Sequence, residues 1–336
     1  HREAGGPHAE VVALSAAGAA AKGASLYVTL SPCNHQGKTP PCVDAIIAAG
    51  IARVVIGCDD PNTRVEGGGI AKLQASGIDV TRGVLEGETK ELIRPWSKYI
   101  TQGLSFLTLK LGVSLDGRIA TKTGHSMWIT CEESRAYAHK LRATHDAVCV
   151  GVNTVIQDDP QLTVRSVPGR NPIRVVFDSK LRIPLDCQLV VSARDVPTCV
   201  VTSDAAGEAE EAALIDLGVS IVRVPVNAQG RCDMVSALRA LAAREVVTVL
   251  CEGGAEIAGS LLAGKLIDDV HLFMAPMLLG PRGRPWAVDW GGPELPEHAP
   301  RIAKPQWEVC GADLHVHGSL TYPKKPKTGP VPQVAG

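Results

Sequence analysis

The sequence predicts an α/β protein of two domains, and three observations support this prediction. Its 336 residues exceed the roughly 100–200 residues of one ordinary domain. Short β-branched runs alternate with Ala- and Leu-rich runs that end at glycine, as strands alternate with helices. A polar segment with a proline, at 90–103, separates two blocks of this alternation and is the expected domain boundary.

The first domain is expected to span residues 1–100 as a small βα unit. Its strand candidates are "SLYVTL", "ARVVIG" and "GIDVTR", at 25–30, 52–57 and 77–82. The runs before and between these strands have helical composition and lie at 10–23, 42–50 and 69–77.

The second domain is expected to span residues 104–322. Buried strands are predicted at 105–113, 146–152, 173–178, 198–203, 220–225, 246–252, 268–275 and 313–322. Helices are predicted at 132–143, 207–217, 233–243 and 255–264. Apolar strands that alternate with helices predict a central parallel or mixed sheet covered on both faces. The Pro-, Lys- and Gly-rich tail, 323–336, is expected to be disordered.

Composition excludes several classes of partner. The chain has 34 Lys and Arg against 35 Asp and Glu, and only 4% aromatic residues, which argues against nucleic acid as a partner. No apolar run approaches the roughly 20 residues that cross a bilayer, so no membrane is expected. Ten cysteines without a framework spacing indicate a reducing, cytoplasmic compartment.

The stretch "SPCNHQGKTPPC" holds two cysteines in a stiff loop, which a disulfide, a metal site or a surface turn could each explain. Upstream, "GGPHAEVVAL" places His8 and Glu10 at the start of a predicted helix, and Cys42 begins another helix, whose N-terminus favours thiolate. His8, Cys33 and Cys42 together offer the three ligands of a catalytic zinc site with one open position for water. Glu10 is then placed to shuttle protons, and H-x-E…P-C…C is the known signature of zinc nucleobase deaminases. Taken singly, each part is more often chance than chemistry.

The second domain has its own cluster of polar motifs. "SLDGRIATKTGHSMWIT" runs from a strand to a helix that we expect to be capped by Thr130 with Glu133 in a capping box. Arg142 and Arg165 flank an Asp-Asp-Pro turn, and arginine suits bidentate phosphate binding. "EGGAEIAGS" forms a Gly-Gly turn before a helix, where a phosphate can approach the backbone, although it lacks the Rossmann fingerprint. Each motif alone also fits a plain connection.

Taken in order, these motifs resemble a known family. "VTLSPCNHQGKTPPC" and "GCDDPNTRVEGGGIAKLQASGIDV" closely resemble the deaminase half of the bifunctional riboflavin-biosynthesis deaminase–reductase family, and 104–322 resembles its reductase half. The resemblance implies a cytidine-deaminase-like αβα domain followed by a dihydrofolate-reductase-like α/β domain. The family usually has Glu where Ser31 precedes Pro32. The chain also opens at His1 without an initiator Met, and we expect it to lack the N-terminal part of the deaminase domain.

The resemblance implies a role for each matching residue. His8, Cys33 and Cys42 correspond to the Zn²⁺ ligands, Glu10 to the proton-shuttling residue, and the pyrimidine ribotide pocket to His35, Lys38, Asp60 and Asn62. NADPH contacts are implied for Gly112, Trp128, Thr154, Asp158, Ser179, Gly254, Ala255, Glu256, Ile257, Ala258, Gly259 and Ser260. Substrate contacts in the reductase half are implied for Lys110, Ser126, Arg142, Leu162, Arg165 and Glu252.

The implied chemistry is two steps on one ribotide. The first is hydrolytic deamination of 2,5-diamino-6-ribosylamino-4(3H)-pyrimidinone 5′-phosphate, and the second is NADPH-dependent reduction to 5-amino-6-ribitylaminouracil 5′-phosphate. A cytoplasmic homo-oligomer is expected. The alternatives are a reductase with an inactive, truncated deaminase domain, a deaminase of nucleic acid, and a structural zinc module that takes a fourth ligand from His35 or Cys58.

Overall fold

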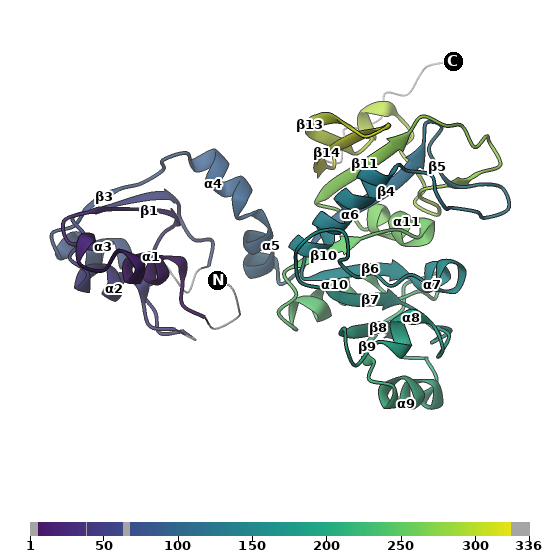
Figure 1. The fold of residues 1–336 in the computed structure, drawn as a ribbon, viewed down its shortest axis with the longest axis horizontal. Coiled ribbons are helices and arrows are strands. Elements are labelled where there is room, and N and C mark those ends of the chain that lie inside the picture. The colour runs from purple at the N-terminus through teal and green to yellow at the C-terminus, as the bar shows by residue number, and fades with distance from the viewer. Residues whose placement is uncertain (1–5, 38, 63–67, 324–336) are drawn as a thin grey trace, which may run out of the picture. The chain divides into compact units, whose positions relative to one another are not determined.

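A computed structural model describes residues 6–37, 39–62 and 68–323 of the chain. Lys38 and nearly all of the tail expected to be disordered lie outside these ranges. The chain divides into two compact units, 1–103 and 104–336, and most of their helices and strands are labelled in Figure 1. No helix in the described ranges has both the length and the apolar character of a membrane span.

The first unit is a three-stranded parallel sheet with helices around it (Figure 1). The strands pair in the order β1 (Ser25–Leu30), β2 (Arg53–Cys58) and β3 (Asp79–Thr81). The helices preceding these strands are α1 (Ala9–Ala17) with the short turn η1 (Gly18–Ala21), α2 (Cys42–Ala48) and α3 (Gly69–Ala75). Val43, Ile46, Val54, Ile56 and Leu73 are buried between the sheet and these helices and form the centre of the core.

The segment expected to hold the domain boundary is helical. It forms α4 (Glu86–Leu92) and α5 (Arg94–Gln102). Pro95 sits in the first turn of α5, where no intrahelical N–H is needed, so the proline does not prevent the helix. Lys90 pairs with Glu86 one turn earlier at 2.6 Å, which supports α4.

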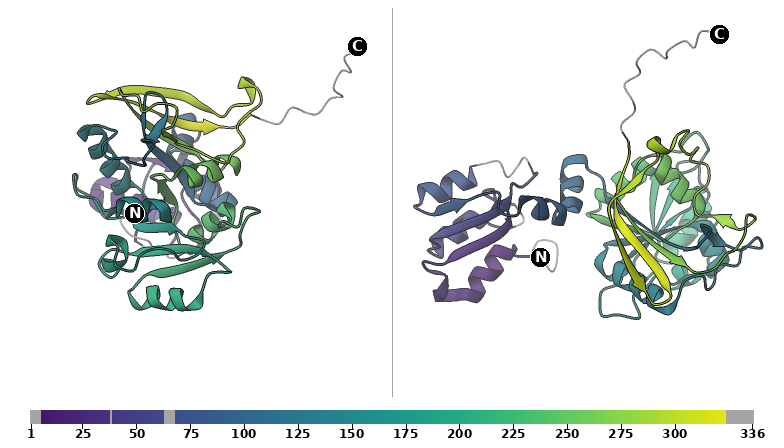
Figure 2. Two further views of the ribbon diagram at one scale, coloured as in Figure 1. Left: turned by 90° about the vertical axis from the view of Figure 1, so that its right-hand side faces the viewer. Right: turned by 90° about the horizontal axis from the view of Figure 1, so that it is seen from above.

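The second unit is built on a nine-stranded mixed sheet in the order β13-β14-β11-β4-β10-β6-β7-β8-β9 (Figure 1). The strands are β4 (Phe106–Ser114), β6 (Ala147–Gly151), β7 (Ile173–Phe177), β8 (Thr198–Ser203), β9 (Ser220–Val224), β10 (Thr248–Cys251), β11 (Asp269–Ala275), β13 (Arg301–Cys310) and β14 (Asp313–Thr321). All pairs from β11 to β9 are parallel, whereas β14 and β13 run antiparallel at one edge. This β13–β14 hairpin is yellow in Figure 2.

Helices cover both faces of this sheet. They are α6 (Glu132–Thr144), α7 (Val152–Asp158), α8 (Gln188–Val191), α9 (Glu208–Asp216), α10 (Met234–Ala242), α11 (Ala255–Ala263) and the short η3 (Pro296–His298). Along β6, Cys149 belongs to one buried apolar cluster and its neighbours Val148 and Val150 belong to another. Successive side chains of a strand point to opposite faces, so the sheet has a core on each side, as its apolar runs predict.

The cysteines behave as the composition predicts. All ten are free, and Cys149, Cys199 and Cys251 are buried within strands as small apolar side chains. Cys33 and Cys42 form no disulfide.

The predicted capping box is wrong. Helix α6 begins at Glu132, at the start of its predicted range, but its N-cap is Cys131 and not Thr130, and the cap side chain makes no capping hydrogen bond. The carboxylate of Asp313, on β14, instead accepts hydrogen bonds from the Cys131 N–H at 2.8 Å and the Ser134 hydroxyl at 2.6 Å. A residue distant in sequence therefore replaces the local cap.

Further elements of this unit were not predicted: α7, α8, η3, the edge strand β13, and the small ribbon of β5 (Arg118–Ala120) with β12 (Arg284–Pro285). Strand β13 contains Pro305, and proline is tolerated only at sheet edges or irregularities. The register of β13 against β14 shifts between Ala303 and Gln306, at this proline.

Candidate functional site

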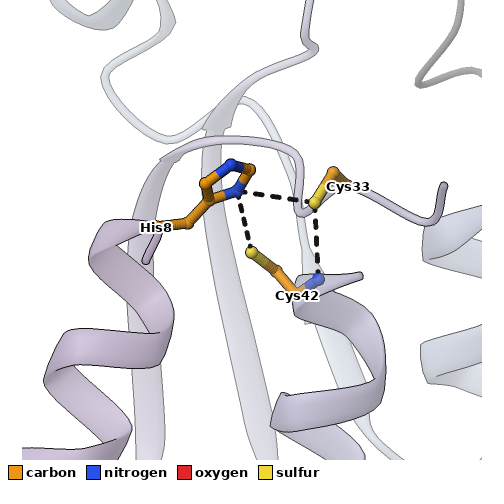
Figure 3. A group of neighbouring side chains, drawn as sticks. All are labelled: His8, Cys33 and Cys42. Carbon is orange, nitrogen blue, oxygen red and sulfur yellow. Dashed lines mark hydrogen bonds between the residues drawn. The ribbon is translucent and has the colours of Figure 1, made fainter. Parts of the chain in front are cut away.

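Three potential metal ligands converge in the first unit. His8 is the N-cap of α1, Cys33 follows β1, and Cys42 is the first residue of α2. Figure 3 shows the three side chains pointing toward one another, with His8 Nδ1 at 3.1 Å from Cys42 Sγ and 3.5 Å from Cys33 Sγ. The backbone N–H of Cys42, at the start of the helix, also donates to Cys33 Sγ at 3.3 Å.

The two thiols cannot ionise together without a cation. The hydrogen bond from the Cys42 thiol lowers the pKa of Cys33 to about 5, and the backbone N–H of Cys42 and the nearby His8 act in the same direction. The Cys33 thiolate in turn raises the pKa of Cys42, as do burial and the Glu10 carboxylate. A dication would remove the repulsion between two thiolates, and one imidazole with two thiolates is a ligand set that zinc prefers. The group therefore fits a zinc ion.

Thr39 fixes the orientation of the imidazole. Its hydroxyl lies 3.2 Å from His8 Nε2, on the side of the ring away from the thiols. A partner at Nε2 favours the tautomer whose Nδ1 lone pair faces Cys33 and Cys42. We did not predict Thr39, and the only signal for it was a hydroxyl in the loop between the two cysteines.

The remaining predicted residues of this unit have different surroundings. Glu10 lies close enough to Cys42 to raise its pKa, which places the carboxylate beside the ligand group. His35 Nδ1 is buried and has no hydrogen-bond partner among the described residues. Asp60 is already engaged, because its Oδ1 accepts hydrogen bonds from the Asn62 N–H at 2.9 Å and the Trp96 indole at 3.3 Å.

Ser31, where the family usually has Glu, joins two loops of the site. Its hydroxyl accepts a hydrogen bond from the Asp60 N–H at 2.9 Å. Cys58, considered as a fourth ligand, donates its thiol to the Thr29 carbonyl. Among the described residues of the first unit, the group of potential ligands consists of His8, Cys33 and Cys42. The arrangement is that of a three-ligand site rather than a closed structural one.

The second unit contains a cavity of about 1620 Å³. It lies at the carboxyl ends of β6, β7 and β10 and reaches α6, α7 and α11. Ligands bind at this end of parallel strands in open α/β sheets. The predicted residues that line it are Lys110, Gly112, Ser126, Trp128, Arg142, Thr154, Asp158, Leu162, Arg165, Ser179, Glu252, Gly254, Ala255, Glu256, Ile257 and Ser260.

Two predicted residues lie away from this cavity. Ala258 is fully buried in the core below α11. Gly259 packs against the backbone of Val288, because a Cβ there would stand only 1.6 Å from the Val288 carbonyl oxygen. Helix geometry explains both, since a run of seven residues covers every face of a helix.

The wall of the cavity near α11 suits a phosphate. Gly253 and Gly254 have φ values of 117° and 97°, and Gly254 is the N-cap of α11. Only glycine adopts these angles without strain, so the backbone can turn its N–H groups and the helix N-terminus toward the cavity. Across the cavity, the Ser126 hydroxyl donates to Asp158 at 3.3 Å, which joins two predicted residues.

Arg142 and Glu252 form a buried bidentate ion pair. Arg142 Nη2 donates to Glu252 Oε2 at 2.8 Å, Nε donates to Oε1, and Nη1 donates to the Thr163 carbonyl at 3.0 Å. The two side chains are 12% and 8% exposed, so neither charge is free to leave its partner. Arg142 is thus a fixed part of the wall.

Lys110 lies beside this pair. Burial lowers the pKa of its ammonium, the Arg142 charge acts in the same direction, and the Glu252 carboxylate opposes them. A lysine with a lowered pKa can give up a proton nearer to neutral pH than an ordinary lysine.

Arg165 contrasts with Arg142 because it is exposed at the mouth of the cavity. Its Nη1 donates to the neutral Gln161 side chain at 2.7 Å and the Thr163 hydroxyl at 2.8 Å. Among the described residues, no hydrogen bond from its Nη2 is found.

A basic group on the cavity wall was missed. Lys180 and Arg182 follow the buried strand β7, and Arg231 lies in the segment joined to Ser179 by the hydrogen bond from the Cys232 N–H to the Ser179 hydroxyl at 2.9 Å. The signal was the run "DSKLR" directly after a strand, from which we selected only Ser179. Three cations and a glycine turn in one large cavity fit a phosphorylated nicotinamide cofactor.

The fold and the two sites together define a zinc deaminase unit joined to a nucleotide-dependent reductase unit. Residues 1–58 match the "Cytidine and deoxycytidylate deaminase zinc-binding region", and residues 105–316 match the "RibD C-terminal domain". A riboflavin biosynthesis protein RibD of Aquifex aeolicus is 45% identical over 315 residues, covering 94% of this chain and 85% of that protein. The chain belongs to the RibD family of riboflavin biosynthesis proteins.

Solved structures show the same architecture. RibD of Acinetobacter baumannii, form 1, is 34% identical, with a TM-score of 0.82 over 96% of this chain and 87% of that chain. A diaminohydroxyphosphoribosylaminopyrimidine deaminase/5-amino-6-(5-phosphoribosylamino)uracil reductase of Thermotoga maritima is also 34% identical, with a TM-score of 0.78 over 94% of this chain and 86% of that chain. These matches confirm a cytidine-deaminase-like domain followed by a dihydrofolate-reductase-like domain. The protein is a bifunctional enzyme whose cofactors are Zn²⁺ and NADPH.

Proposed function

We propose that this chain deaminates 2,5-diamino-6-ribosylamino-4(3H)-pyrimidinone 5′-phosphate and then reduces the ribosyl group of the product. The convergence of His8 Nδ1 with the Cys33 and Cys42 thiols carries the proposal for the first step. The two activities in the name of the Thermotoga maritima relative support the order, because hydrolytic loss of one amine converts the diaminopyrimidine into the aminouracil that the reductase takes.

In the deaminase unit, zinc held by His8, Cys33 and Cys42 would supply Lewis-acid activation of a water molecule. Glu10 accepts a proton from the attacking water and delivers it to the departing amine, which leaves as ammonia. Thr39 keeps His8 in the tautomer that offers Nδ1. The buried Nδ1 of His35, which bonds to none of the described residues, is a ready partner for a polar group of the pyrimidine ribotide, and we assign Asp60 and Asn62 to the loop that borders it.

In the reductase unit, NADPH would supply the hydride. We assign the Gly254 turn and the basic group Lys180, Arg182 and Arg231 to its phosphates. Reduction adds a hydride to C1′ of the opened sugar and also requires one proton. Lys110 lines the cavity and its lowered pKa suits it to give this proton, and Glu252 with Arg142 holds its surroundings in place.

The test is to assay the two half-reactions separately on the purified chain. Ammonia release from the diamino substrate should depend on Cys33 and Cys42, whereas NADPH oxidation with the deaminated substrate should not. A Cys33→Ser/Cys42→Ser variant that still releases ammonia at the wild-type rate would overturn the assignment. NADPH oxidation without any ammonia release by the wild-type chain would instead support a reductase alone.

We also propose that the enzyme is cytoplasmic and forms a homo-oligomer. The ten free cysteines fit a reducing compartment. On the outermost strand β13, Trp307 and Val309 are 62% and 81% exposed, which gives an apolar surface that a second copy would cover. Sedimentation of the wild-type protein and of a Trp307→Ser/Val309→Ser variant tests this proposal. The wild type should sediment as an oligomer and the variant as a monomer, and two monomers would contradict the proposal.

A further inference from the structure

A second group of side chains that could hold a metal ion lies on β13 and β14, at one edge of the sheet of the reductase unit. Glu308 on β13 and His315 on β14 are register partners, and His317 lies two residues further on the same face of β14. His315 Nδ1 is 2.7 Å from Glu308 Oε1, and His317 Nε2 is 4.0 Å from the same oxygen. The three donor atoms all lie within 4.8 Å of one another.

His271, on the adjacent strand β11, orients the central ring of the group. Its Nδ1 lies 3.0 Å from His315 Nε2. The His271 and His317 rings stack at 5.1 Å, and the His315 and His317 rings at 4.7 Å. In the tautomer in which His315 donates its Nε2–H to His271, the His315 Nδ1 lone pair faces Glu308.

A cation between Glu308 and His315 would stabilise this tautomer. A lone pair and a carboxylate oxygen at 2.7 Å repel each other unless a proton or a metal ion lies between them. Within the described ranges, the ion pairs of Glu308 are with His315 and His317 and not with a lysine or arginine. A proton can join only these two atoms, whereas a metal ion also engages His317, whose Nε2 lies 4.0 Å from the same oxygen.

We propose that Glu308, His315 and His317 form a second metal site, which binds a divalent transition-metal ion such as Zn²⁺. Two imidazoles and one carboxylate form a common zinc ligand set, and a neighbour that accepts the other N–H of a ligating histidine is typical of such sites. Tetrahedral zinc with N and O ligands needs donor atoms about 3.3 Å apart. The observed separations of 2.7 and 4.0 Å lie on either side of this value.

The ion can enter without disturbing the core. The Glu308 side chain is 50% exposed and the His317 side chain 24% exposed, so both can adjust, whereas His315 is fully buried and fixed. None of the three lines the reductase cavity. The ion would join β13 to β14 and hold the edge of the sheet, with its open position toward solvent.

Metal stoichiometry of the full-length chain tests this proposal. After equilibration with Zn²⁺ and removal of unbound ion, the wild-type chain should retain two equivalents, because the His8 site binds the other. A Glu308→Gln/His317→Gln variant should retain one, a Cys33→Ser/Cys42→Ser variant should retain one, and the combined variant none. Glu297→Gln/His298→Gln, which changes the same residue types just before β13, is the matched control and should retain two.

Co²⁺ gives a second readout that separates the sites. In the Cys33→Ser/Cys42→Ser variant, Co²⁺ should give visible ligand-field bands without thiolate charge-transfer absorption, and Glu308→Gln/His317→Gln should abolish them. The proposal is overturned if the wild-type chain retains one equivalent, or if the second equivalent persists without Glu308 and His317. Unchanged circular dichroism of each variant shows that a lost ion does not reflect a lost fold.

Discussion

Glu10 is placed to act on protons and not on the metal. Its carboxylate lies beside Cys42, but it is not a member of the donor group formed by His8, Cys33 and Cys42. We therefore expect Glu10→Gln to retain the zinc of this site while ammonia release falls by a factor of about 10² to 10⁴, the usual contribution of a general acid–base. Metal analysis and an ammonia assay on the same preparation check both parts. Glu88→Gln, an exposed carboxylate on α4, is the control and should change neither.

Substitutions of Arg165 and Arg142 in the reductase cavity should have different effects, the first on substrate binding and the second on stability. Arg165→Ala should raise the KM for the phosphorylated substrate about tenfold or more, because a hydrogen bond to a charged group is worth about 1.5–3 kcal/mol. Arg165→Lys should recover part of this loss, since lysine binds an anion without the bidentate geometry. The Kd for NADPH should stay near the wild-type value, and an unchanged KM in Arg165→Ala would remove Arg165 from the phosphate site.

Arg142→Ala should instead destabilise the unit. It leaves the Glu252 carboxylate buried and unpaired, which costs about 3–5 kcal/mol in comparable pairs. The melting temperature of the reductase unit should therefore fall. A change in KM for this variant would reflect the loss of stability as well as any lost contact with the substrate. Arg142→Ala with an unchanged melting temperature would contradict the structural role given to the ion pair.

Lys110 predicts a pH dependence for the reduction. A general acid works in its protonated form, so the rate should fall as pH rises through the Lys110 pKa. Burial lowers that pKa from the ordinary 10.5, so this alkaline limb should begin below pH 10.5. A kcat–pH profile under saturating NADPH and substrate measures it. Lys110→Met should abolish this alkaline limb. The control Lys140→Met, on the exposed side of α6, should keep it. If Lys110→Met shows the same limb as the wild type, the limb belongs to another group.

Among individual residues, those whose type and spacing indicate a chemistry were predictable from the sequence. The contacts that hold these residues in place were not. The spacing of His8, Cys33 and Cys42 carries the metal chemistry in the sequence itself, and the structure brings the three together. Thr39, which orients His8, and the partner Glu252, which engages Arg142, depend on contacts between segments distant in sequence. The individual roles assigned to the site residues stay predictions.

At the scale of elements, the cap of α6 is a contact between β14 and a helix nearly the whole domain away in sequence. Asp313 is buried and accepts hydrogen bonds from the Cys131 N–H and the Ser134 hydroxyl. Asp313→Ala should cost about 1–3 kcal/mol locally, because it removes the acceptor of two hydrogen bonds at the start of α6. Backbone amides in the first turn of α6 should exchange about tenfold to a hundredfold faster, which hydrogen-exchange mass spectrometry measures.

A local cap provides the comparison. Asp233 is the N-cap of α10 and accepts from the Ser236 N–H at 2.7 Å within the same helix. Asp233→Ala should speed exchange in α10 and leave α6 unchanged, whereas Asp313→Ala should do the reverse. If Asp313→Ala leaves α6 exchange unchanged, the carboxylate is not its cap.

Elements were predictable where burial gave them a clear pattern. The central strands β4, β6, β7 and β8 are rich in apolar residues and largely buried on both faces, and each lies within a residue or two of its predicted range. Strand β13 was missed because most of its side chains are exposed and Pro305 interrupts it. An edge strand is held by its pairing with β14, and a sequence pattern does not show that pairing.

For the whole molecule, residues alone predicted two α/β domains, and the mixed sheet follows from the apolar runs. The strand order, with β10 inserted between β4 and β6, does not follow from any pattern in the chain, because it depends on which strands pair across long connections. The particular folds came from the resemblance of several ordered motifs to a family.

The two activities should therefore be separable in one chain, because every donor of the His8 site lies in 1–103 and every residue of the reductase cavity lies in 104–336. Cys33→Ser/Cys42→Ser should abolish ammonia release and leave NADPH oxidation with the deaminated substrate within about twofold of wild type, since neither change touches a residue of that cavity. Paired assays on one preparation measure this. The variant is a better test than a chelator, which would also remove an ion from the proposed Glu308 site. Loss of NADPH oxidation together with ammonia release would show that the reductase unit needs an intact zinc site to fold or act.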